Sequence, residues 1–250
     1  MKLNEKIMLD QPDKHAVGGA AAYGLFSYVL IPFVLFWMSF GFDWDPSFLF
    51  GGQLVHHGIN FLAAIWLFRE YLRDAFLTVQ TETRMVVSNV ARSVGAIAVY
   101  YIGLWSVLPI LNNSFFISLI FGSLPIGEVD LLLFVPDFVS LSPVIGSLVV
   151  ILLTPLTTTC LYYAMGFAPV CYQKPWLAYV VVALVLAIPR VINSVLFWGA
   201  GQELAIYLGQ LPVHLLACRA YQKCDTVWAP IFCLMAANLI ACAYLAIYIF

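Results

Sequence analysis

The chain has 250 residues, of which 63% are hydrophobic and 10% charged, and its formal net charge is −2. Soluble domains average about half apolar and about a quarter charged residues, so this composition predicts a membrane protein and excludes an ordinary soluble domain. The charge balance gives no indication of a nucleic-acid partner. The polar N-terminus mixes acidic with basic residues and is unlike a cleavable signal peptide.

Seven apolar segments are each close to the roughly 20 residues that a helix needs to cross a bilayer. We therefore expect an all-α fold, a polytopic transmembrane helical bundle of about seven to eight spans that forms a single membrane domain over residues 1–250. Residues 1–16 would be a cytosolic N-terminal segment. The seven segments are residues 17–40, 47–68, 93–111, 143–168, 175–200, 202–219 and 226–249.

Two connecting segments have patterns of their own. Residues 69–92 place Leu72, Phe76 and Val79 at helical spacing opposite charged positions, which predicts a cytosolic amphipathic connector. This helix either lies along the lipid headgroups or extends the neighbouring helices. Residues 113–142 contain apolar patches, and a short re-entrant or surface helix there would change the number of spans by one.

The basic residues indicate the orientation of the bundle. Ten of the eleven lysines and arginines fall on one side of the seven spans, and the loops on the other side hold acidic residues without any lysine or arginine. Cytoplasmic loops of membrane proteins carry this excess of positive charge. We therefore expect an integral, multi-pass plasma membrane protein with its N-terminus inside and its C-terminus outside.

Few ionisable residues fall within the spans, and each is a functional candidate because charge is costly in lipid. The adjacent His56 and His57 point in different directions, and the cysteines show no metal-ligand spacing, so we expect neither a metal nor another cofactor. The six cysteines are interpreted as apolar packing residues. Glu203, at the outer edge of the sixth span, is interpreted as an interfacial residue, about three helical turns from His214.

Arg190 is the costliest of these residues and must point inward, toward carbonyls or an anionic partner. It follows Pro189 and precedes Asn193 by about one helical turn. A structural ion pair is one interpretation. The other is a helix interrupted at Pro189, which would suit the discontinuous substrate-binding helix of a small transporter or channel component.

Three stretches share a pattern of proline, aromatic and polar residues. They are LLTPLTTTCLYYAMGF, SVLFWGAGQE and CRAYQKCDTVWAPIFCLMAANL. Over residues 140–245 they resemble the CAAX protease and bacteriocin-processing (CPBP) family, multi-helical intramembrane endopeptidases related to the Ras-converting prenyl proteases. The third stretch carries most of the likeness, through Tyr221, Lys223, Thr226, Trp228, Pro230 and Ile231.

The family's pattern is a proline followed by EExxxR, then a phenylalanine with a histidine four residues later, then HxxxN. Pro155 and Phe197 match the family's proline and its second phenylalanine. The family's reactive positions are occupied here by Thr158 and Thr159 for the glutamate pair, Tyr163 for the arginine, Gly201 and Leu234 for the two histidines, and Asn238 for the asparagine.

The resemblance implies a scaffold without its chemistry. In the family a glutamate activates water, while histidine and asparagine position it and stabilise the oxyanion. A threonine hydroxyl cannot activate water without a neighbouring base. The expectation is therefore a pseudoprotease of a bacterial plasma membrane that binds a membrane-protein or lipidated-peptide partner. Its polar cavity would be lined by Thr157, Thr158, Thr159, Tyr162, Tyr163, Arg190, Asn193 and Asn238, unless these residues serve helix packing.

One further alternative is an active endopeptidase with relocated catalytic residues. Glu203 or His214 would then act as the acid or base and would have to approach Asn238 from another helix.

Overall fold

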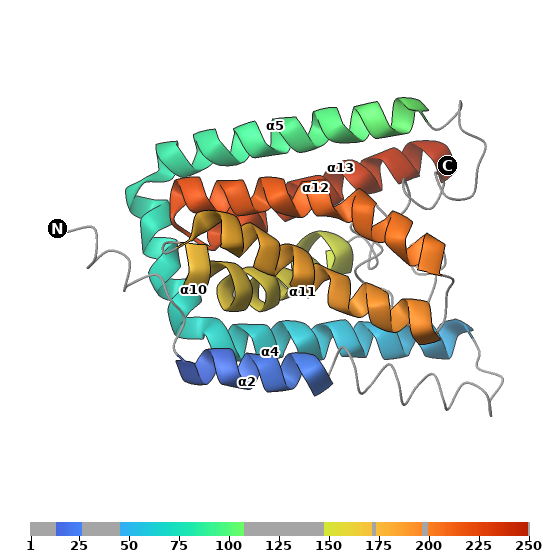
Figure 1. Cartoon of the computed structure of the whole chain (residues 1–250), viewed down its shortest axis with the longest axis horizontal. Coiled ribbons are helices and arrows are strands. Elements are labelled where there is room, and N and C mark those ends of the chain that lie inside the picture. The colour runs from blue at the N-terminus through green and yellow to red at the C-terminus, as the bar shows by residue number, and fades with distance from the viewer. Residues whose placement is uncertain (1–13, 27–45, 108–147, 172–173, 197–199, 250) are drawn as a thin grey trace.

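The computed structural model describes residues 14–26, 46–107, 148–171, 174–196 and 200–249. Within these ranges the chain forms helices and no strands, which confirms the predicted all-α class (Figure 1). The long helices are α2 (Lys14–Leu25), α4 (Pro46–Thr81), α5 (Thr83–Val107), α11 (Pro175–Leu196), α12 (Ala200–Cys224) and α13 (Trp228–Ile249).

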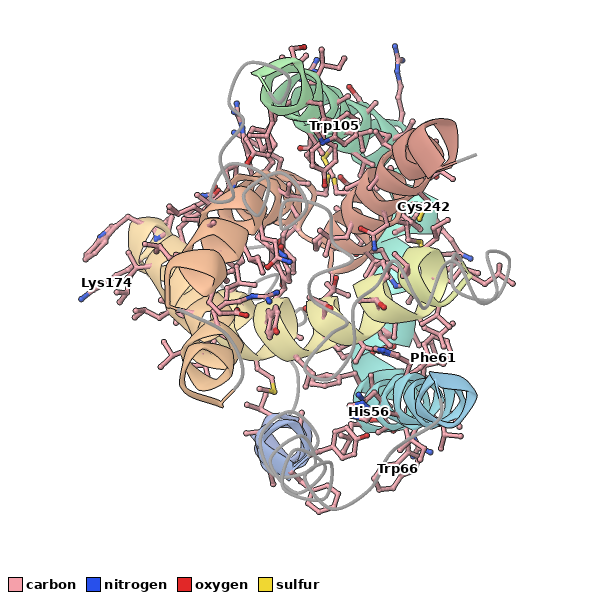
Figure 2. All side chains as sticks on the ribbon, turned by 90° about the vertical axis from the view of Figure 1, so that its right-hand side faces the viewer. His56, Phe61, Trp66, Trp105, Lys174 and Cys242 are labelled. Carbon is pink, nitrogen blue, oxygen red and sulfur yellow. The ribbon has the colours of Figure 1, made fainter. Side chains whose placement is uncertain are left out.

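One further helix, Val149–Cys171, runs obliquely through the middle of the bundle, and we call it the central helix. In Figure 2 it crosses the interior from the side of α4 and α13 to the side of α11 and α12. Gly166 brings it close to α11, because a Cβ atom there would meet Val181 at 3.4 Å. The central helix therefore touches helices from both halves of the chain.

The central helix changes its winding along its length. It consists of η3 (Val149–Leu153), α9 (Thr154–Thr158), η4 (Thr159–Phe167) and α10 (Ala168–Cys171), and η3 and η4 are π-helical. The amide of Thr154 donates to the carbonyl of Val149, five residues earlier. Pro155 follows this wide turn directly. Proline supplies no N–H and crowds the preceding turn, so a wider turn relieves the contact.

The connections that carry basic residues lie together at one end of the bundle. The α4–α5 junction, the start of α11 and the α12–α13 turn are at the left of Figure 1, and the end of α11, the start of α12 and the end of α13 are at the right. The connector predicted over residues 69–92 extends its neighbours, since residues 69–81 belong to α4 and residues 83–92 to α5.

The α12–α13 turn is fastened to α4. Tyr221 shares a hydrogen bond of 3.0 Å with the hydroxyl of Tyr71, and Thr226 donates to the carbonyl of Ala75 at 2.9 Å. The indole N–H of Trp228 donates to the carbonyl of Leu72 at 2.8 Å. The turn itself passes through the left-handed region at residue 225, an aspartate with φ of 55°. Aspartate tolerates this conformation better than most side chains.

The outward faces of the helices are apolar. Exposed residues on α4 and on α11 recur at spacings of three and four, which places each set on one face of its helix. Trp66 exposes 70% of its surface, and Figure 2 shows it on the outside of α4. The stripes are Val55, Ile59, Leu62 and Trp66 on α4, and Val180, Leu184, Ile188 and Val191 on α11.

Within the described residues, two helices are long and apolar enough to cross a bilayer, Thr83–Ser106 and Val149–Cys171. Shorter apolar runs are Pro175–Ile188 and Trp228–Ala243. Buried core helices of soluble proteins satisfy the same two criteria, so seven or eight spans remain a prediction. Residues 113–142 and the end of the first predicted span lie outside the described residues.

Candidate functional site

A buried charged cluster joins α11 to α12. Arg190 lies 3.6 Å from Glu203, measured between Nη1 and Oε2, and its Nη2 donates to Oε1 of Gln210 at 2.9 Å. All three side chains are buried. The expectation that Arg190 points inward is confirmed. Glu203, interpreted as an interfacial residue, lies in the first turn of α12, and its buried carboxylate balances the charge of Arg190.

A second buried contact joins the central helix to α12. The hydroxyl of Tyr163 lies 2.8 Å from Nδ1 of His214 and 3.2 Å from the carbonyl oxygen of the same residue. The two rings are stacked with their centroids 6.0 Å apart, and Tyr162 meets the His214 ring edge-on. Two of the residues singled out from the sequence, Tyr163 and His214, are therefore brought together.

The threonines of the central helix have buried side chains. Thr157 donates its hydroxyl to the carbonyl of Leu153 in its own helix at 3.0 Å. Thr158 and Thr159 are buried beside it. The Thr159 hydroxyl has no hydrogen-bond partner within the described part of the chain.

The asparagine at the position that matches the family pattern makes a hydrogen bond to the backbone. Asn238 on α13 donates from Nδ2 to the backbone carbonyl of Val150 at 2.6 Å, which ties α13 to the start of the central helix. Leu234, one turn earlier, is buried in the hydrophobic core. A leucine at that position fills space and can neither carry a proton nor bind an oxyanion.

The structure does not keep all the motif positions together. Gly201 is exposed, and a Cβ atom at this position would meet nothing within 4 Å. The side chain of Asn193 lies outside the described residues. The helix interruption expected at Pro189 is absent, because α11 continues through it to Leu196. Of the eight residues predicted to line a polar cavity, six have buried side chains, and Tyr162 is partly buried.

His56 of α4 belongs to a separate polar contact. Asn60 lies 3.1 Å from Nε2 of His56 and accepts a hydrogen bond from Tyr23 of α2, so this cluster joins α2 to α4. Figure 2 shows His56 on the side of α4 that faces α2. Among the described residues, no group of three or more histidine, cysteine or acidic side chains could hold a metal ion. Five of the six cysteines are buried, which agrees with their interpretation as packing residues.

The sequence interpretation missed Gln210. Glu203, Gln210 and His214 are spaced by seven and four residues on α12, and this spacing places them on one face. The signal was therefore present, but a single glutamine in an apolar span gives no reason to select it before its partner on α11 is known.

Comparison of the sequence with family models and with curated proteins, and of the structure with solved structures, found no match. The resemblance to the CPBP family rests on the residues quoted above.

The three residues that a relocated protease would use are each engaged in a separate contact. Glu203 is engaged with Arg190, His214 with Tyr163, and Asn238 with a backbone carbonyl. The three residues that a relocated protease would use thus make contacts in three different places. A general base must come within hydrogen-bond reach of the water that it activates.

Proposed function

We propose that this chain is a multi-pass membrane protein with a CPBP-like scaffold and no proteolytic activity, which binds a partner inside the membrane. The observation that carries the membrane assignment is the distribution of side chains. Arg190, Glu203 and His214 are buried, while leucine, isoleucine, valine and tryptophan occupy the outward faces. Exposed apolar surface of this extent marks a lipid or protein contact, and the lipid bilayer covers every outward face at once.

The position of the basic loops supports the orientation. They gather at one end of the bundle in Figure 1. By the excess of positive charge in cytoplasmic loops, we propose that this end faces the cytosol. The exposed Trp176 at the start of α11 is next to Lys174, as expected of aromatic and basic residues at a membrane interface. The proposed location is a bacterial plasma membrane, with the N-terminus inside and the C-terminus outside.

The absence of proteolysis is supported by the residues at the motif positions. Thr158 and Thr159 offer hydroxyls where the family has carboxylates, and Leu234 is an apolar core residue. Asn238 is held by the carbonyl of Val150. Without a carboxylate or an imidazole at these positions, the scaffold has no group to activate water. The partner is a membrane protein or a lipidated peptide, the substrate classes on which such scaffolds act.

The test compares new protein N-termini, by mass spectrometry, in membranes from cells with and without this chain. We expect no terminus that depends on its presence, at a depth where an active CPBP protease examined in parallel yields clear cuts. Termini that appear with the wild-type chain and vanish in Glu203→Ala or His214→Ala would overturn the proposal in favour of an endopeptidase with a relocated site.

A positive identification of the partner uses the chain in its own membrane. Crosslinking from a photoreactive residue at Thr159, inside the bundle, is expected to capture a membrane or lipidated polypeptide. The same residue at the exposed Gly201 is the control for random collisions. Capture from both positions with equal yield would count against an internal binding site.

A further inference from the structure

An open, shallow hollow of about 600 Å³ lies where α4 ends and α5 begins. Figure 1 shows this junction at the end of the bundle that carries the basic residues. Two of the side chains that line the hollow, Arg84 and Ser88, are exposed and can be reached by a ligand from outside the bundle. The complete lining is Thr81, Glu82, Thr83, Arg84, Met85 and Ser88.

The arginines of α5 differ from those of α4 because they form no ion pair. Arg69 and Arg73 of α4 lie 3.8 Å and 3.2 Å from the carboxylate of the next residue along the chain. Within the described residues, Arg84 and Arg92 of α5 form neither an ion pair nor a hydrogen bond, and both are exposed. A guanidinium stays charged at every physiological pH, so both cations are available to an anion from outside the chain.

The two arginines and Ser88 lie on one face of α5, because residues four apart on a helix share a side. Arg92 follows Arg84 by eight positions, which is about 12 Å along the helix axis. Ser88 lies between them along this face. A guanidinium presents its N–H groups in a fork that matches the oxygens of a phosphate. This face therefore offers a phosphate two charged donors and a hydroxyl.

The acidic residue of the lining, Glu82, is directed to the inner side of α5. Burial raises the pKa of the Cys224 thiol to about 11, and the carboxylate of Glu82 is close enough to add a smaller part of this rise. Cys224 is buried, and its sulfur faces the carbonyl of Val86. Side chains two positions apart on a helix do not face each other, so Glu82 and Arg84 point to different sides. Glu82 therefore weakens the positive charge of the outer face without cancelling it.

Beyond Arg92 the same face of α5 is apolar. Gly95 is exposed, and a Cβ atom there would meet nothing within 4 Å. Val99 and Ile102 follow at helical spacing and expose 70% and 63% of their surface. Only 22% of the apolar stretch of α5 is buried inside the described part of the protein, against 67% for the central helix. A hydrocarbon chain can therefore lie along this face while its headgroup stays beside the arginines.

We propose that the hollow at the α4–α5 junction, with Arg84, Ser88 and Arg92, binds the phosphate headgroup of an anionic phospholipid, whose acyl chains lie along α5 toward Val99. Anionic lipids give the cytoplasmic leaflet its negative surface potential, and basic residues at that surface attract them. The inference rests on the membrane placement and the orientation of the proposed function. It is independent of the absence of proteolysis, because it uses none of the positions that match the protease motif.

The test reconstitutes the purified full-length protein in phosphatidylcholine with phosphatidylglycerol as the minor component. After extraction in a mild detergent, mass spectrometry measures the ratio of the two lipids that stay bound to the protein, relative to the starting mixture. Phosphatidylglycerol should be enriched about tenfold or more, and Arg84→Gln or Arg92→Gln should each lower the enrichment about fivefold. Glu82→Gln should raise it, because the competing carboxylate is removed.

Arg69→Gln is the matched control, because it removes the same charge from an exposed arginine of α4 that already has an acidic partner. It should change the enrichment by less than about twofold. Equal losses for Arg69→Gln and Arg84→Gln would show a diffuse attraction to the basic end and overturn the site. Displacement of the lipid by soluble glycerol phosphate would assign the hollow to a soluble ligand and overturn the lipid.

The two lipids also separate this inference from the proposed function on which it rests. A protein that retains phosphatidylcholine without any preference for phosphatidylglycerol would overturn the headgroup site and leave the membrane placement standing. A protein that retains neither lipid would count against the membrane placement, and the headgroup site would be overturned with it.

Discussion

At the scale of single residues, hydrogen bonds between buried polar side chains stabilise the interior of this protein. Tyr163 and His214 are the clearest pair, because each is almost wholly buried and the tyrosine hydroxyl faces both the ring and the backbone of its partner. Removing one member leaves the polar atoms of the other without the contact. That loss costs more than the hydrogen bond contributed, because the remaining group stays buried.

We expect Tyr163→Phe to lower the free energy of unfolding by about 1–3 kcal/mol. The measurement is thermal or denaturant unfolding of the purified protein in detergent. A cycle with His214→Phe and the double variant isolates the pair, and the double variant should be less destabilised than the sum of the single ones. Strict additivity would mean that the two side chains do not stabilise each other.

Asn238 provides a second residue-scale prediction, through the contrast between two substitutions. Its amide donates to the carbonyl of Val150, while Oδ1 accepts no hydrogen bond within the described residues. Asn238→Leu removes one hydrogen bond and one buried acceptor together, so its cost should be about 1 kcal/mol. Asn238→Asp places a charge against a carbonyl and should cost about 3 kcal/mol or more.

The same unfolding assay ranks the two Asn238 variants. An aspartate tolerated as well as leucine would show that water reaches this position. Such a result would contradict the structural role that we assign to the asparagine.

The sequence predicted that Arg190 needs a partner inside the bundle, because an isolated guanidinium in lipid is expensive. It did not identify that partner. Glu203 is only thirteen residues further along the chain, but it reaches Arg190 because α11 and α12 fold back on each other (Figure 1). That geometry is a property of the helix pair, which no single residue reveals.

At the scale of helices, the α12–α13 turn explains much of the family-like pattern. Tyr221, Thr226 and Trp228 all form hydrogen bonds with residues of α4. The third stretch of the resemblance is therefore a set of hydrogen-bonding contacts at the end of the bundle that carries the basic residues.

Thr226→Val tests this fastening, because valine keeps the shape and removes the hydroxyl that donates to Ala75. We expect a loss of about 1 kcal/mol in the free energy of unfolding. Thr81→Val is the matched control. Its hydroxyl is exposed and bonds to its own helix at Leu77, so the change should stay within about 0.5 kcal/mol. Equal effects of the two substitutions would mean that the turn is not fastened through Thr226.

The positions of the helices were largely predictable from the sequence. The π-helical turns of the central helix were not. Hydropathy located α11, α12 and α13 to within about five residues, because a long apolar run in lipid must satisfy its backbone as a helix, whereas α5 begins ten residues before the predicted span over residues 93–111. The π-helical turns of the central helix depend on Pro155 and on packing from several sides at once. The sequence pattern of one segment contains no information about the helices that pack against it.

At the scale of the whole molecule, the orientation yields a direct prediction. Lys223→Cys at the basic end should react with a membrane-impermeant maleimide only in inside-out vesicles, and Gly201→Cys only in right-side-out vesicles. Labelling of both positions from the same side would contradict the predicted topology.

The native cysteines should add little background in this experiment, and the wild-type chain is the blank. Cys224, beside Lys223, is buried. Burial, only partly offset by a hydrogen bond with Asn89, raises the pKa of the Cys224 thiol to about 11. The thiolate is the reactive form, so any labelling of Cys224 should be slow at neutral pH and rise about tenfold per pH unit as the pH approaches that value.

The central helix also sets the order in which the protein can be completed during synthesis. It contacts α2 and α4, which the ribosome makes before it, and α11 and α13, which follow. The faces of α2 and α4 that pack against the central helix therefore stay uncovered until residues 149–171 are made. A nascent chain that stops before them would leave those faces without their packing partner.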